Sequence, residues 1–196
     1  MPDFPMPHMP EAECNALTNA LRGANTYLEF GMGGSTTLAA RMGVPNVISV
    51  DSSKEWIDSI SSQISQIEQT GRIQLLHANL GETGAWGYPI DSNNIANWPS
   101  YYTGAWAAVR AKGVDPDLVL IDGRFRIPCF LYSLLHLKGG ATILWDDYKP
   151  RPEYHLIEKH LKPIEFYGGM AAFKVQNDMD VAAIVSSLFE NLYDLG

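Results

Sequence analysis

The sequence predicts an α/β fold, a mostly parallel sheet with helices on both faces. Short apolar runs of strand length alternate along the chain with segments of helical spacing, an order that produces right-handed crossovers and parallel strands. The run from Asp117 to Asp122 is apolar between two acidic ends, which is typical of a strand buried on both faces. Near the end of the chain, Gly168 and Gly169 separate two further apolar runs and indicate a closing antiparallel hairpin.

Length and composition fit one globular domain. The chain has 196 residues, of which 46% are hydrophobic, and this is a common size for a single domain. Its 14 Lys and Arg residues against 22 Asp and Glu residues give a net charge of −8, which argues against binding nucleic acid through a basic face. No apolar run reaches the length of a membrane span, and the N-terminus lacks the pattern of a signal peptide. We therefore expect a cytoplasmic protein with no membrane partner.

The first half of the chain alternates helices with strands. Residues 1–10 hold four prolines and are expected to form an extended arm. The elements expected next are a helix from Glu11 to Leu21, a strand at Tyr27–Phe30, a helix from Ser35 to Met42, a strand at Asn46–Asp51, a helix capped by Ser53 with an apolar stripe from Trp56 to Ile67, and a strand at Ile73–His77.

The second half begins with a less regular segment over residues 79–113. Six aromatic residues crowd its middle, and we interpret the segment as an aromatic cap. The elements expected after residue 100 are a helix from Tyr101 to Ala111, a strand at Asp117–Asp122, a helix from Arg126 to Leu137, a strand at Ala141–Trp145, a helix from Glu153 to Leu161, a hairpin of Pro163–Tyr167 and Met170–Val175, and a helix from Asp178 to Leu195.

A glycine-rich turn joins the first predicted strand to the second predicted helix. Gly31, Gly33 and Gly34 follow Glu29-Phe30, and Asp51 ends the next strand 20 residues after Gly31. Glycines let a ligand approach the backbone, and a helix N-terminus favours an anionic group. An acid at the end of the next strand can accept hydrogen bonds from ribose hydroxyls. The pattern predicts a nucleotide-type cofactor.

The same segment resembles the E/D-x-G-x-G motif of class I S-adenosylmethionine-dependent methyltransferases. Glu29 stands two residues before Gly31, whereas a dinucleotide-binding loop would place glycine where Thr36 stands. The resemblance covers about residues 25–175 and implies a Rossmann-like seven-stranded sheet whose last strand is antiparallel. It implies S-adenosylmethionine as the cofactor, with Gly31 and Gly33 near its methionine part, Asp51 on the ribose and Asn79 near the adenine. The full set of cofactor residues that it implies is Glu29, Gly31, Gly33, Ser35, Asp51 and Asn79.

Three shorter segments are similar to a group of uncharacterised bacterial methyltransferase-like proteins. They are T-G-A-W-G-Y-P at 83–89, D-G-R-F-R at 122–126 and D-D-Y at 146–148. This closer resemblance implies the same fold and cofactor and names no substrate.

Acidic residues follow two predicted neighbouring strands, Asp122 after one and Asp146 and Asp147 after the next. Three close carboxylates repel one another unless a positive charge lies between them, and their oxygens suit Mg²⁺. Several O-methyltransferases bind a divalent ion at these positions, and the resemblance implies catalytic and metal-binding roles for the three acids here. The alternative is that they are loop acids whose charge is offset by Arg124 or Lys149. Phe125 stands where catechol-type enzymes carry a lysine, so no general base is assigned.

Arg124, Arg126 and Trp86 are the candidate substrate residues. Arginine forks suit carboxylate or phosphate, so the two arginines could recognise an acidic acceptor, or one of them could pair with Asp122 or Asp146 and order the loop. Aromatic residues such as Trp86 suit a lid over the substrate, but they are equally at home in a packed cap or a homodimer contact.

We therefore predict a methyltransferase, dependent on S-adenosylmethionine, that methylates a hydroxyl of a small molecule with Asp122, Asp146 and Asp147 organising the acceptor directly or through Mg²⁺. Two alternatives remain. One is a binding protein that keeps the fold and the cofactor without transfer activity, which the missing lysine favours. The other is an NAD-dependent oxidoreductase, which Glu29 and Thr36 disfavour.

Overall fold

Seven strands form one sheet in the computed structural model, which describes residues 6–68 and 71–196. The strands are β1 (Thr26–Phe30), β2 (Asn46–Asp51), β3 (Arg72–His77), β4 (Leu118–Ile121), β5 (Thr142–Trp145), β6 (Glu165–Tyr167) and β7 (Met170–Lys174). Their order across the sheet is β3-β2-β1-β4-β5-β7-β6. The first five are parallel to one another, whereas β7 is antiparallel to both β5 and β6. The predicted α/β fold with its antiparallel closing hairpin is confirmed.

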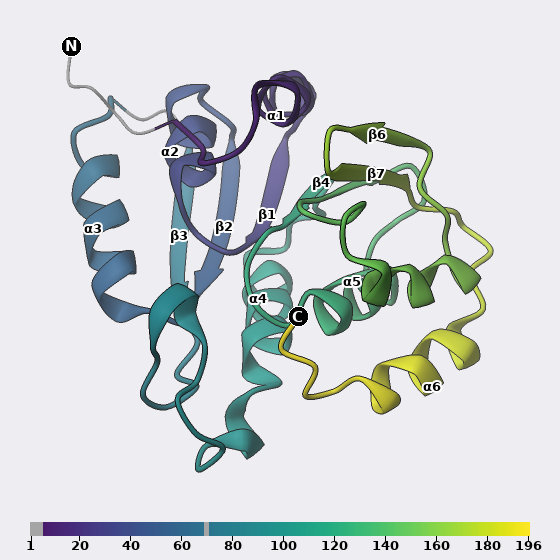
Figure 1. The fold of residues 1–196 in the computed structure, drawn as a ribbon. Coiled ribbons are helices and arrows are strands. Elements are labelled where there is room, and N and C mark those ends of the chain that lie inside the picture. The colour runs from purple at the N-terminus through teal and green to yellow at the C-terminus, as the bar shows by residue number, and fades with distance from the viewer. Residues whose placement is uncertain (1–5, 69–70) are drawn as a thin grey trace.

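Helices cover both faces of this sheet (Figure 1). In the part of the chain that the structure describes they are α1 (Glu11–Gly23), α2 (Gly34–Arg41), α3 (Lys54–Ile64), α4 (Ser100–Lys112), α5 (Arg126–Leu134) and α6 (Val181–Glu190), with the 3₁₀ helices η1 (Ala85–Gly87), η2 (Ile95–Asn97) and η3 (Pro152–Lys159). α1, α2 and α3 pack in series on one face, and α4, α5 and α6 pack in series on the other. Across these same residues, no helix combines the length and apolar character needed to cross a membrane.

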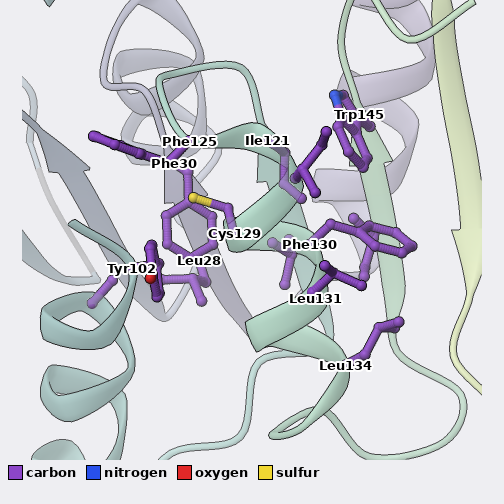
Figure 2. Close-up of a cluster of buried hydrophobic side chains, with 14 of the residues drawn as sticks. Leu28, Phe30, Tyr102, Ile121, Phe125, Cys129, Phe130, Leu131, Leu134 and Trp145 are labelled. Atoms are coloured by element: carbon purple, nitrogen blue, oxygen red, sulfur yellow. The ribbon is translucent and has the colours of Figure 1, made fainter. Parts of the chain in front are cut away.

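The central strands send alternate side chains into two hydrophobic cores. Leu28 and Phe30 of β1 lie in the core beneath α4, α5 and α6, while Tyr27 lies in the core beneath α1 and α2. The larger core extends to Trp145 of β5, whose ring centroid is 5.1 Å from that of Phe130 in α5 (Figure 2). The sheet is therefore buried on both faces, which leaves its strand ends as the accessible edges.

The aromatic residues of the 79–113 segment divide into two groups. Trp98, Tyr101, Tyr102 and Trp106 are buried in the larger core, as the packed-cap interpretation expected. Trp86 remains 82% exposed on η1, where its backbone has a φ of +58°. Only the part of the segment before α4 is therefore available to cover a ligand.

Three helices end earlier than the sequence patterns predicted. α3 stops at Ile64 and α5 stops at Leu134. Trp56 of α3 is 45% exposed, and its indole nitrogen donates a hydrogen bond to the carbonyl of Met32. α6 stops at Glu190, and the chain after it returns to the sheet, where the backbone N–H of Phe125 donates to the Leu195 carbonyl at 3.0 Å.

Two further differences concern the type of one element and the reach of the structure. The helix expected from Glu153 to Leu161 is the 3₁₀ helix η3 instead of an α-helix. Of the predicted arm, residues 1–5 lie outside the described residues.

The order of strands reverses between β1 and β4, because β2 lies on one side of β1 and β5 lies on the far side of β4. Sheets of this kind bind ligands beyond the carboxyl ends of their strands at such a point. Gly31 follows β1 there with a φ of +100°, a conformation that favours glycine. A Cβ atom at Gly31 would collide with the backbone nitrogen of Gly123, which follows β4. The two loops touch backbone to backbone.

We expect Gly31→Ala to lower the free energy of unfolding by about 2–4 kcal/mol, because both the positive φ and the collision with Gly123 oppose a side chain. Gly104→Ala is the matched control, since an added Cβ there meets no atom within 4 Å in the middle of α4. That change should leave stability unaltered or raise it by about 0.5–1 kcal/mol. Urea unfolding followed by circular dichroism measures both, and equal stability of the two variants would contradict the close approach.

Candidate functional site

The turn after β1 leaves room for a ligand over its second glycine. A Cβ atom at Gly33 would meet only the hydroxyl of Ser35, at 4.0 Å, so the space above this residue is open. Ser35 itself is buried in the first turn of α2. The open space at Gly33, next to a helix N-terminus, is where a ligand could approach the backbone.

Glu29 supports this turn from beneath. Its carboxylate is fully buried and accepts hydrogen bonds from the hydroxyls of Tyr27 (3.0 Å), Ser49 (2.6 Å) and Thr36 (2.5 Å). Burial raises the pKa of Glu29, and these hydroxyls partly oppose that rise. The Thr36 hydroxyl in turn accepts from the backbone N–H of Gly33 at 3.0 Å. Glu29 thus acts on the turn through Thr36, the residue that replaces a third glycine.

Asp51 lies beside the turn at the end of β2. Its two carboxylate oxygens accept from the backbone N–H groups of Met32, at 3.1 Å, and Ser53, at 2.9 Å. Burial raises the pKa of Asp51, while these N–H groups lower it. Each carboxylate oxygen retains a further acceptor site for a ligand hydroxyl. Asn79, after β3, is exposed at the same edge, and its side chain accepts from the N–H of Gly81 at 3.2 Å.

Arg126 ties together the loops that follow β4 and β5. Its guanidinium, in a residue only 3% exposed, donates to the carbonyls of Gly123 (2.9 Å), Asp146 (2.6 Å) and Asp122 (3.0 Å). It also forms ion pairs with the carboxylates of Asp122, at 3.2 Å, and Asp147, at 3.5 Å. This residue is therefore the arginine that orders the loop, one of the two roles that the sequence left open.

The three predicted acids converge, and a fourth acid joins them. Burial and the neighbouring charges of Asp122 and Asp147 raise the pKa of Asp146 to about 7. Burial also raises the pKa of Asp122 to about 6, against the opposing charge of Arg126. Glu13 of α1 hydrogen bonds to Asp146, and burial raises its pKa as well. Asp122 and Asp146 lie close enough that each affects the pKa of the other, and Asp122 is the more accessible of the two.

These residues do not fit a divalent metal site. Within the two described ranges, no three Asp, Glu, His or Cys side chains are placed to hold an ion together. The guanidinium of Arg126 lies where the ion would bind, since it pairs with both Asp122 and Asp147. Arg151 pairs with Asp147 as well, at 2.8 Å. Arginine offsets the charge of these carboxylates, so Mg²⁺ at Asp122, Asp146 and Asp147 is not supported.

Arg124 is buried at the same edge without such partners. Its guanidinium lies over the ring of Tyr88, 4.1 Å from the ring centroid, and the residue is 8% exposed. Tyr88 is anchored by its own hydroxyl, which donates to the carbonyl of Gly196 at 2.8 Å. Tyr88 therefore covers the arginine, whereas Trp86, the aromatic candidate of the sequence analysis, is 82% exposed.

Sequence reasoning did not single out Glu13 or Tyr88. An acid in the first turn of a helix is normally explained by the helix dipole, so nothing in the sequence marks Glu13 as a partner of Asp146. Tyr88 stands in a segment of six aromatic residues, and only the fold of the 83–89 turn selects it. The backbone N–H of Gly84 donates to the Tyr88 carbonyl at 2.8 Å within this turn, and the Tyr88 ring stacks on Arg124.

Comparison with solved structures places the fold among methyltransferases. A methyltransferase-like protein from Silicibacter pomeroyi is 32% identical, and the match covers 97% of this chain and 98% of that one with a TM-score of 0.85. A candidate rRNA methylase from Clostridium thermocellum (10% identity, TM-score 0.53, covering 87% and 99%) has a similar fold. So does the C-terminal domain of a precorrin-6Y C5,15-methyltransferase from Rhodobacter capsulatus (14% identity, TM-score 0.51, covering 89% and 94%). No family model and no curated protein matches the chain.

The raised pKa of Asp146 predicts a loss of stability as the pH rises. A carboxyl group with a folded pKa of about 7 stabilises the fold fully below its unfolded pKa of 3.8, and this contribution disappears as the pH rises through about 7. Asp146→Asn, which mimics the protonated acid, should reduce the decrease in unfolding free energy between pH 4 and 8 by at least about 1 kcal/mol, the value of one pKa unit.

Asp58→Asn is the matched control for this pH series, because Asp58 is an exposed acid paired with Lys54 on α3. Urea unfolding at each pH measures the free energy. If the unfolding free energy has the same pH dependence in Asp146→Asn and in the wild type, folding does not raise the pKa of Asp146.

Proposed function

Because the chain belongs to the class I S-adenosylmethionine-dependent methyltransferase superfamily, we propose that it binds S-adenosylmethionine beyond β1 and β2 and methylates a hydroxyl of a small molecule. The observation that carries the proposal is the open space over Gly33, with a free face of Asp51 beside it. Here a glycine backbone and an acid at the end of the next strand lie together at the switch point of the sheet.

The residues present fit the cofactor. Gly33 would admit its methionine part against the backbone, and Asp51 would accept hydrogen bonds from both ribose hydroxyls. Asn79, exposed beyond β3, would lie on the adenine side. Ser35 and Glu29 are buried, so their role in this proposal is to hold the turn rather than to touch the ligand.

Bound S-adenosylmethionine supplies an electrophilic methyl group on a positively charged sulfur. The Asp122–Asp146 pair provides a proton acceptor on the next strands of the same edge. Asp122 would take the hydroxyl proton as the acceptor oxygen bonds to the methyl carbon and the bond from that carbon to sulfur breaks, with S-adenosylhomocysteine as the leaving group. A pKa near neutrality suits that task. Arg126 fixes the pair, because it binds the loops after β4 and β5 at once.

A small-molecule acceptor suits the acidic charge of the chain better than nucleic acid. With a net charge of −8, the protein offers little attraction to a phosphate backbone. The structural similarity to a candidate rRNA methylase, at 10% identity, concerns the fold alone. The negative charge of the chain therefore supports a small molecule as the methyl acceptor.

The second candidate function is cofactor binding without transfer. The observation that favours it is Phe125, which occupies the position of the lysine in catechol-type enzymes and is fully buried, so it brings no base to the site. Release of labelled methyl groups into a pool of hydroxylated metabolites would separate the two functions, since only the transferase produces methylated compounds.

The cofactor proposal predicts a thermal shift with S-adenosylhomocysteine. At about 100 times its Kd this ligand should stabilise the protein by about 2.7 kcal/mol, which raises the Tm by several degrees. Asp51→Ala and the milder Asp51→Asn should lose most of this shift, because they remove acceptors for the ribose. Asp58→Ala, an exposed acid on α3, should retain it. Stabilisation by NADH and none by S-adenosylhomocysteine would overturn the proposal in favour of an oxidoreductase.

A further inference from the structure

We propose that Arg124 is the receptor for an oxyanion carried by the methyl acceptor, so that the substrate is a hydroxy compound with a carboxylate or phosphate group. The proposal rests on the transferase function above and names its substrate class. Arg124 stands two residues after Asp122, the proposed proton acceptor, in the loop that follows β4. An anion held there would place the rest of its molecule at the same edge of the sheet.

The first observation is a set of unused donors. Arg124 is 8% exposed, and its Nε and Nη1 atoms are enclosed with no hydrogen-bond partner among the residues that the structure describes. Leaving buried donors of a charged group unpaired costs free energy, which a bound anion would recover. Arg126, in the same loop, shows the contrast, since its three guanidinium nitrogens all donate to oxygens at 2.6–3.2 Å.

The second observation is how the arginine is enclosed. The Tyr88 ring lies 4.1 Å from the guanidinium carbon and covers one face of the group. Stacking uses the face of a guanidinium and leaves its in-plane N–H groups without a partner from the ring. The Tyr88 hydroxyl is fixed on the Gly196 carbonyl, so the wall over Arg124 is held by residues from two distant parts of the chain. An anion bound here would be shielded from water and its pairing strengthened.

The third observation concerns the surrounding charges. The other two arginines at this edge are paired, Arg126 with Asp122 and Arg151 with Asp147. The charge of Arg124 lowers the pKa of Asp51, but no ion pair within 4.0 Å joins the two in the described chain, and Asp51 is already held by the N–H groups of Met32 and Ser53. Among the described residues at this edge, Arg124 is therefore an arginine with no carboxylate within ion-pair distance, which leaves its guanidinium for an anionic ligand.

The test measures thermal shifts with three probes in the presence of saturating S-adenosylhomocysteine. They are 4-hydroxybenzoate, its neutral analogue 4-hydroxybenzamide, and inorganic phosphate. We expect 4-hydroxybenzoate or phosphate to raise the Tm of the wild type, the neutral analogue to have no such effect, and Arg124→Gln to lose the response. The anion that acts tells a carboxylate receptor from a phosphate receptor.

Two further variants complete this experiment. Arg124→Lys keeps the charge without the fork and should respond less than the wild type, which also covers the case that Arg124→Gln does not fold. Arg22→Gln removes an exposed charge from the last turn of α1, at the opposite edge of the sheet, and should respond like the wild type. Equal responses in the wild type and in both Arg124 variants would overturn the proposal, and so would equal responses to 4-hydroxybenzoate and 4-hydroxybenzamide.

The oxyanion could also be the carboxylate of the cofactor itself. 5′-Methylthioadenosine lacks that carboxylate, so a loss of S-adenosylhomocysteine binding in Arg124→Gln with unchanged 5′-methylthioadenosine binding would assign Arg124 to the cofactor and overturn the proposal. If the wild type does not bind S-adenosylhomocysteine at all, the proposed function fails by itself. The anion response, repeated without that ligand, still reports on Arg124.

Discussion

The architecture of the candidate site depends on the backbone contact between Gly31 and Gly123 at the switch point of the sheet. Register places Phe30 opposite Ile121, so the loops that leave β1 and β4 start level with each other and have to turn apart at once. Only residues without a Cβ allow this. The turn after β1 then leads away towards Asp51, and the loop after β4 leads towards the carboxyl cluster. The contact thus separates the proposed cofactor side of this strand edge, with Asp51, from the side that holds the carboxyl cluster.

The two arginines in the loop after β4, Arg124 and Arg126, have different surroundings and different proposed roles. Arg126 takes the place that a metal ion holds in related arrangements, because one buried guanidinium can satisfy three carbonyls and two carboxylates of the neighbouring loops. Asp122 and Asp146 remain two neighbouring carboxyl groups whose pKa values are raised by burial. Arg124 takes no part in the hydrogen bonds and ion pairs of Arg126, and its guanidinium lies under the ring of Tyr88 instead. In the proposed function, Arg126 therefore positions the loops and Asp122 takes the proton. The two roles belong to different side chains of one short loop.

Local pattern was sufficient to predict the sheet, because central strands such as β1, β2, β4 and β5 are short apolar runs that end at glycine or an acid. The convergence of Asp122, Asp146 and Asp147 was also predictable, since neighbouring parallel strands end at one edge. The residue that offsets the charge of these acids was not predictable, because the sequence offered several cations. Which of them reaches the acids depends on how the side chains lie in the folded structure. The same holds for Glu13, which meets Asp146 only once α1 packs beside the closing hairpin, where its carboxylate also accepts from the Gly169 N–H at 2.7 Å. A contact between two segments that lie far apart in the sequence leaves no pattern in either segment from which it could be predicted.

The most direct test of the central claim, that the edge beyond β1 and β2 is a nucleoside-binding site, is a crystal structure of the protein grown with S-adenosylhomocysteine. The account predicts both ribose hydroxyls on the carboxylate of Asp51 and the amino-acid part of the ligand against the backbone of Gly33, with Arg126 still paired to Asp122. A ligand bound in the groove between α1 and the β6–β7 hairpin, which Asn15 and Tyr167 line, would contradict it. So would a ligand at the predicted edge that leaves Asp51 without a contact.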